Sequence, residues 1–73
     1  MMEEIYKNYL LTSNIHNRLK NHCAIRWEVM RKVKNGWEGT HAVIENVEGN
    51  ISDDRALVHG MQKAREYVDR SLH

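Results

Sequence analysis

Histidine, cysteine and carboxylate side chains are the residues of this chain that could bind a metal or transfer a proton. Five histidines occur in 73 residues, and only His16, His22 and Cys23 lie near one another in the sequence. His22 and Cys23 are adjacent, so their side chains point in different directions on a strand or on a helix. No CxxC, HxxxH or HExxH spacing completes a tetrahedral ligand set. The sequence therefore predicts no metal site and no cofactor, and Cys23 is expected in the core.

His41, Glu45, His59 and Glu66 are the residue types of a general acid–base pair. Nothing in their spacing requires them to meet, and a domain of this size has little depth for a dry pocket. Ribonuclease toxins of similar size use a few His, Glu and Arg residues on a small sheet, so such a toxin is the third and most distant hypothesis. The four glycines fit turns and a packing contact rather than a phosphate-binding loop. We therefore expect no enzyme and no catalytic residue.

The length of the chain predicts one domain, residues 1–73, with one modest core. No segment approaches the 18 or so apolar residues that a membrane span needs, and the first residues are acidic rather than basic. A single cysteine cannot form an internal disulfide, which agrees with a reducing compartment. These features predict a cytoplasmic protein that has no membrane contact.

Charge is divided into two blocks in the middle of the chain. Residues 18–34 hold six basic side chains against Glu28 alone, whereas residues 35–54 hold five acids and no lysine or arginine. Two interpretations stay open: the blocks pair with each other in the fold, or the basic block faces a polyanion.

The last third of the sequence predicts one amphipathic helix from about Asp53 to Leu72. Ser52 is a good N-cap, and acids in the first turn with bases in later turns favour the helix dipole. Its apolar stripe has spacings of three and four and consists of Leu57, Met61, Ala64, Val68 and Leu72.

A small-residue edge formed by Ala56, Gly60 and Ala64 lies beside this stripe. Gly60 costs a helix about 1 kcal/mol relative to alanine, so its presence calls for a reason. Such an edge lets another backbone approach closely. The neighbour is either the protein's own sheet or a second chain, as a homodimer or another partner.

The central segment predicts a β-hairpin that turns at Asn35-Gly36, the sequence of a type I′ turn. The expected cross-strand pairs are Lys34 with Trp37, Trp27 with Ile44 and Arg26 with Glu45. A rival interpretation makes residues 13–34 one long helix in an all-α fold, because their apolar residues also share a helical stripe. The hairpin is preferred because residues 41–47 need a strand partner.

Residues 2 to about 22 are predicted to be helical in both cases, with a break near residues 12–14, where the apolar stripe jumps. The preferred architecture is therefore a small α+β domain with the element order α(α)ββα and a two-stranded antiparallel hairpin.

Binding of a protein partner is the function that these features predict, by a small regulatory or inhibitory module that forms a homodimer or binds another protein. Free-standing domains of this size are often inhibitors, antitoxins or accessory factors of mobile elements. The predicted protein-binding residues are Trp37, Ala56, Gly60 and Tyr67. Aromatic side chains are typical interface anchors.

Nucleic-acid binding is the alternative function. A basic strand with an aromatic residue can follow a phosphate backbone. The predicted contacts are Arg26, Arg31, Lys32 and Lys34, within the basic segment 18–34.

Overall fold

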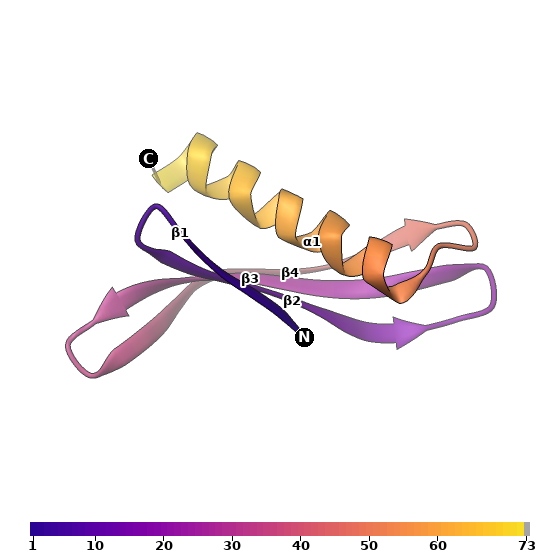
Figure 1. Ribbon diagram of the computed structural model, residues 1–73, viewed down its shortest axis with the longest axis horizontal. Coiled ribbons are helices and arrows are strands. Elements are labelled where there is room, and N and C mark those ends of the chain that lie inside the picture. The colour runs from indigo at the N-terminus through magenta and orange to yellow at the C-terminus, as the bar shows by residue number, and fades with distance from the viewer. Residues whose placement is uncertain (73) are drawn as a thin grey trace.

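The computed structural model describes residues 1–72, which form a four-stranded antiparallel sheet with one helix across one of its faces (Figure 1). The strands are β1 (Met2–Tyr6), β2 (Tyr9–Arg18), β3 (His22–Val33) and β4 (Gly36–Glu48). They lie in the sheet in the order of the sequence, β1-β2-β3-β4. The helix α1 (Asp53–Tyr67) follows, and a turn of π-helix, η1 (Val68–Leu72), ends it. The α+β class and the C-terminal helix are as predicted, and Ser52 caps α1 by accepting from the Arg55 N–H.

The prediction of helices at the N-terminus is wrong, because residues 2–18 form strands β1 and β2. Lys7 and Asn8 connect them, and both have positive φ, 49° and 71°, as a type I′ turn requires. The jump in the apolar stripe near residues 12–14 was the sign of a two-residue period rather than of a helix break. The long helix over residues 13–34 is likewise absent, since those residues belong to β2 and β3.

The hairpin of β3 and β4 is present, but its register differs from the prediction. Val33 pairs with Gly36, so the turn lies at Lys34-Asn35, and Asn35 is not among the residues of positive φ. Trp27 consequently lies opposite Val43 rather than Ile44, Arg26 opposite Ile44 rather than Glu45, and Lys32, not Lys34, opposite Trp37. A slip of one residue moves every side chain of a strand to the other face. Val43 and Val47 therefore face the helix, and Ile44 faces away from it.

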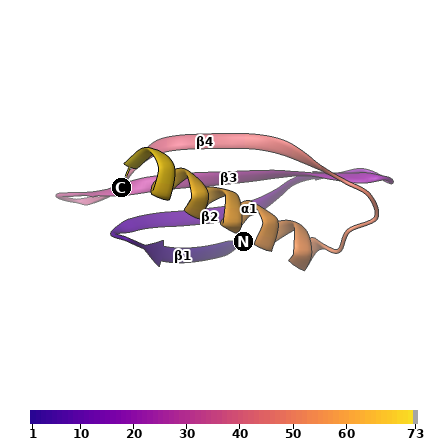
Figure 2. The same ribbon diagram turned by 90° about the horizontal axis from the view of Figure 1, so that it is seen from above.

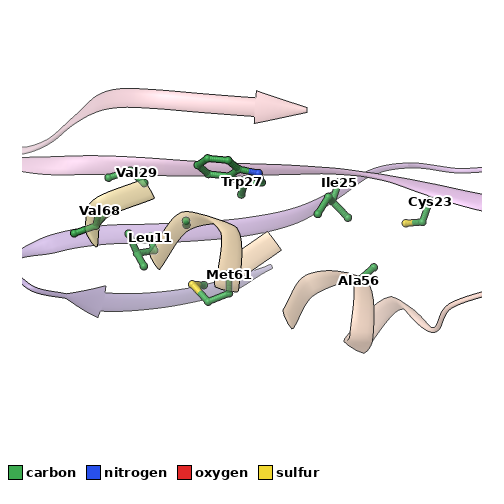
Figure 3. Close-up of a cluster of buried hydrophobic side chains, with 9 residues drawn as sticks. Leu11, Cys23, Ile25, Trp27, Val29, Ala56, Met61 and Val68 are labelled. Atoms are coloured by element: carbon green, nitrogen blue, oxygen red, sulfur yellow. The ribbon is translucent and has the colours of Figure 1, made fainter. Parts of the chain in front are cut away.

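The core lies between α1 and one face of the sheet, which we call the covered face (Figure 3). Leu11 on β2 and alternate residues of β3 point toward the helix, as the pleat of a strand requires. These side chains are almost fully buried: Leu11, Cys23, Ile25, Trp27 and Val29. The helix contributes Ala56, Met61, Ala64 and Val68 to the same cluster. Cys23 is a core residue, as predicted.

Polar contacts tie the first hairpin to the end of the chain. Arg65 on α1 donates to both carboxylate oxygens of Glu4 on β1. Asp69 accepts from Lys7 Nζ at 2.7 Å and from Tyr6 Oη at 3.0 Å. The Glu4–Arg65 contact is bidentate, which makes it geometrically specific for this position of the helix over the sheet.

Candidate protein-binding surfaces

The small-residue edge of the helix packs on the sheet of its own chain. Ala56 is fully buried and Gly60 is buried as well. A Cβ atom at Gly60 would collide with Ser13 Oγ and would lie 3.1 Å from Ile25 Cδ1. The neighbour that approaches this edge closely is therefore the protein's own sheet and not a second chain. Ala56 and Gly60 are not on a surface where a second chain could dock.

Tyr67, the third predicted binding residue, belongs to an aromatic cluster between α1 and β4. Its ring stacks on that of His41 with centroids 4.1 Å apart and planes 3° apart, and the Trp27 ring lies 6.2 Å away. A groove of about 390 Å³ runs beside this cluster. The residues that line it are Trp27, Val43, Glu45, Lys63, Glu66, Tyr67, Arg70 and Ser71. We call this the α1–β4 groove.

Glu45 joins β4 to both β3 and the helix. Its carboxylate accepts from Trp27 Nε1 at 3.4 Å and lies 3.2 Å from His59 Nε2. The structure thus brings together one histidine and one carboxylate of the acid–base set, while His41 is stacked on Tyr67. The His59 and Glu45 side chains are 39% and 29% exposed. The pair can hold the helix against β4 in an open groove that water reaches.

Within residues 1–72, no three His, Cys, Asp or Glu side chains lie close enough together to hold a metal ion. The same part of the chain contains no helix with the length and apolar character needed to cross a bilayer.

Trp37, the fourth predicted binding residue, lies on the opposite face of the sheet from Tyr67. It is directly opposite Lys32 in the ladder, and Lys32 Nζ is 5.1 Å from the centroid of the Trp37 ring. Opposite residues of an antiparallel pair point to the same face, and Lys32 alternates with the buried residues of β3. Trp37 is half-buried in this position. β4 begins at Gly36, so Trp37 lies next to the turn of the β3–β4 hairpin.

The basic residues of segment 18–34 do not gather on one surface. Arg31 pairs with Glu38, and Arg18 pairs with Asp53, so two members of the basic block meet members of the acidic block. Arg26 pairs with Glu28 on its own strand. Of the four predicted nucleic-acid contacts, Arg26 and Lys32 face away from the helix, Arg31 faces the other way, and Lys34 lies in the turn.

The face of the sheet opposite α1 has no covering element in residues 1–72, and we call it the open face (Figure 1). Ile5, Leu10 and Met30 lie side by side in one row across β1, β2 and β3. Ile5 is 66% exposed, whereas Leu10 and Met30 are half-buried. On β4, Ile44 is 53% exposed and Trp37 adds an aromatic ring. This face combines an apolar row with an aromatic side chain near one end.

Charges of both signs surround these apolar residues on the open face. Glu3, Thr12 and Glu28 form the neighbouring row, and Arg26 lies beyond it in salt-bridge contact with Glu28. Thr12 is only 5% exposed although no element covers it, so the side chains around it close over the sheet there. A surface of mixed charge with an apolar centre is typical of a protein interface rather than of a phosphate-binding site.

Displaced pKa values occur where the first hairpin meets the helix and the π-helical turn after it. The hydrogen bonds from Arg65 lower the pKa of Glu4 below its usual value of 4.5, and burial opposes them. The bond to Asp69 raises the pKa of Lys7. These shifts belong to contacts that hold the fold together.

Sequence reasoning missed Ile5, Leu10, Met30 and Ile44 as surface residues. The first two were assigned to a helix, and Ile44 was placed inside by the register expected for the hairpin. In the structure Glu4 and Tyr6, the two neighbours of Ile5, contact the C-terminal helical segment, so the pleat of β1 places Ile5 on the open face. Comparison of the chain with protein-family models, curated proteins and solved structures gives no match.

Proposed function

We propose that this chain is a small non-enzymatic module that regulates or inhibits a protein partner by binding it through the open face of the sheet. The observation that carries the proposal is the apolar row of Ile5, Leu10 and Met30, with Ile5 66% exposed, on a face that no element of residues 1–72 covers. Antiparallel sheets tolerate one solvated face when that face is polar. A contiguous apolar row on such a face marks a surface that binds something else.

Trp37 is the aromatic anchor in this proposal. Its ring lies at the end of the open face, half-exposed, with the Lys32 ammonium over it. Tryptophan is the residue type most enriched among those that dominate binding energy in protein interfaces. Tyr67 and the α1–β4 groove lie on the other side of the sheet, and the proposal does not use them.

The test is affinity capture from cells of the source organism, with wild type, Ile5→Glu and Trp37→Ala as baits. We expect wild type to retain one or a few specific proteins and both variants to lose them. The matched control is Val58→Glu, which adds the same charge at a position on α1 that is 51% exposed. Retention by the control and by both open-face variants would refute the open face as the binding surface. Melting curves of the baits separate loss of binding from loss of folding.

Nucleic-acid binding predicts a different outcome in a parallel assay. Retention on duplex DNA or RNA would fall steeply with salt and would be lost in Lys32→Glu/Lys34→Glu. Because Arg26 and Arg31 are already paired with carboxylates, we expect no retention above background at low salt.

A further inference from the structure

β4 is the longer of the two edge strands of the sheet, with 13 residues against 5 in β1. No strand within residues 1–72 pairs with its outer edge, and α1 crosses the sheet without extending over it (Figure 2). An unpaired edge presents N–H and C=O groups to any strand that approaches. Residues 36–48 contain no lysine, arginine or proline, which are residues that natural edge strands use to prevent pairing. This edge is therefore open to a further strand.

We propose that a second copy of this chain pairs with the outer edge of β4, antiparallel and about a two-fold axis at Val43. The two sheets then become one continuous sheet of eight strands, with both helices on the same side. The proposal does not require the open face, because the second copy pairs through the backbone N–H and C=O groups of the β4 edge; Ile44 borders both surfaces. Closed two-fold dimers are the commonest symmetric assembly, and they require an edge that is complementary to itself.

Self-complementarity of β4 selects this axis. Directly opposite residues of an antiparallel pair point to the same face of the sheet. In a two-fold pair of identical strands, one residue must therefore lie directly opposite the same residue of the second copy, with the axis between them. With the axis at Val43, that valine meets its counterpart and His41 lies opposite Glu45 of the second copy on the helix side. On the other side, Ala42 lies opposite Ile44. Apolar residues thus meet apolar residues, and imidazole meets carboxylate.

Neighbouring axes give poorer pairs. An axis at Ile44 places Val43 opposite Glu45 and His41 opposite Val47. An axis at Glu45 brings two carboxylates together, which is destabilising. Among these three axes, the one at Val43 matches both faces of the strand.

A bulge limits the length of the paired segment. His41 pairs with Val29 and Gly39 with Met30, so Thr40 is an extra residue in β4, and its Oγ1 donates to the Val29 carbonyl at 2.8 Å. A bulge ends regular pairing. Regular pairing past Thr40 would set Glu38 opposite Glu48 of the second copy, so the bulge lies where the pairing should end.

The first test is sedimentation equilibrium over a range of concentrations. We expect wild type to reach twice the chain mass of 8.6 kDa. His41→Asp sets two carboxylates opposite each other and Glu45→Lys sets an ammonium opposite His41, so each variant alone should dimerise at least about tenfold more weakly. An equimolar mixture should recover the dimer, because the new carboxylate then faces the new ammonium. Glu3→Lys on the far edge of the sheet is the control and should behave as wild type.

The second test is disulfide formation at the axis. Directly opposite Cα atoms of an antiparallel pair lie about 4.5–5.5 Å apart, within the range that a disulfide spans. Val43→Cys should therefore oxidise readily to a covalent dimer, whereas Ile44→Cys, displaced from its counterpart, should do so far more slowly. The native Cys23 is fully buried and is common to both proteins.

A wild-type chain that remains monomeric up to its limit of solubility would overturn the proposal. So would a wild-type dimer that the mixture of charge variants does not restore, or that links equally well through both cysteine positions. Neither result would bear on partner binding at the open face, which the capture experiment tests separately.

Discussion

Ile25 and Ile44 are isoleucines on neighbouring strands, and their side chains lie on opposite faces of one sheet. Ile25 on β3 is completely buried beneath α1, whereas Ile44 on β4 is 53% exposed. The same contrast separates Leu11 on the covered face, which is fully buried, from Ile5 on the open face, which is 66% exposed. The covered face thus forms the only large core that residues 1–72 build, and apolar residues on the open face are not needed for it. That difference separates the residues that hold this fold from those that are free to bind.

Truncation of the two isoleucines should give the largest difference between the faces. Ile25→Ala removes buried methyl and methylene groups beside the helix, and we expect it to lower the free energy of unfolding by about 3 kcal/mol. Ile44→Ala should lower it by less than about 0.5 kcal/mol. Urea denaturation of the monomer, at a concentration below any self-association, measures both. Similar losses at the two positions would show that the open face is buried in solution.

Gly60→Ala tests how closely the helix approaches the covered face. Alanine favours a helix by about 1 kcal/mol over glycine, but the added Cβ would collide with Ser13 Oγ. We expect a net loss of about 1–2 kcal/mol, as for other overpacked cores. Thermal or urea unfolding provides the measurement.

Ser13→Ala is the partner variant of that experiment. Ser13 Oγ is buried and has no hydrogen-bond partner among the residues that the structure describes, so its removal alone should change stability little. In the double variant most of the loss from Gly60→Ala should disappear. If the double variant is as unstable as Gly60→Ala, the contact with Ser13 is not the reason for the glycine.

The smallest expected effect on stability is that of the Glu4–Arg65 pair, and it depends on pH. Because Arg65 lowers the pKa of Glu4 in the folded state, this pair stabilises the fold fully above pH 4.5, and the stabilisation is lost as the pH falls below that value. The pair is partly exposed to solvent, so we expect Glu4→Gln to cost about 0.5 kcal/mol at pH 6 and almost nothing at pH 3.

Glu3→Gln is the matched control on the open face. It removes an adjacent carboxylate and leaves the bond between Glu4 and Arg65 intact, so it should keep the wild-type loss of stability between pH 6 and pH 3. An equal effect of both substitutions at each pH would show that the Glu4–Arg65 pair does not couple stability to pH.

The C-terminal helix and the central hairpin could be predicted from the sequence because residues close together in the chain determine both. Ser52 with the acids after it starts the helix, and β-branched residues flank the turn near Asn35. The N-terminal hairpin was missed because its turn, Lys7-Asn8, lacks the glycine that normally marks a type I′ turn. The register of β4 was missed because it depends on a turn one residue earlier and on the bulge at Thr40, and both depend on packing.

The candidate surfaces were predicted less well than the fold. Trp37 was placed correctly beside a strand turn, but the faces of Ile5 and Ile44 follow from strand register, which composition does not encode. Ala56 and Gly60 were identified as a close-approach edge, and only the position of the sheet shows what approaches it.

The order of the elements along the chain has a consequence for how the protein is made. A chain leaves the ribosome with its N-terminus first. The four strands are neighbours in sequence as well as in space, so each can pair as soon as it emerges. The cover for Leu11 and Ile25, however, lies in α1 and η1, which are synthesised after all four strands. Until α1 and η1 have been synthesised, both faces of the sheet are therefore bare, and the nascent chain exposes the apolar side on which its stability rests.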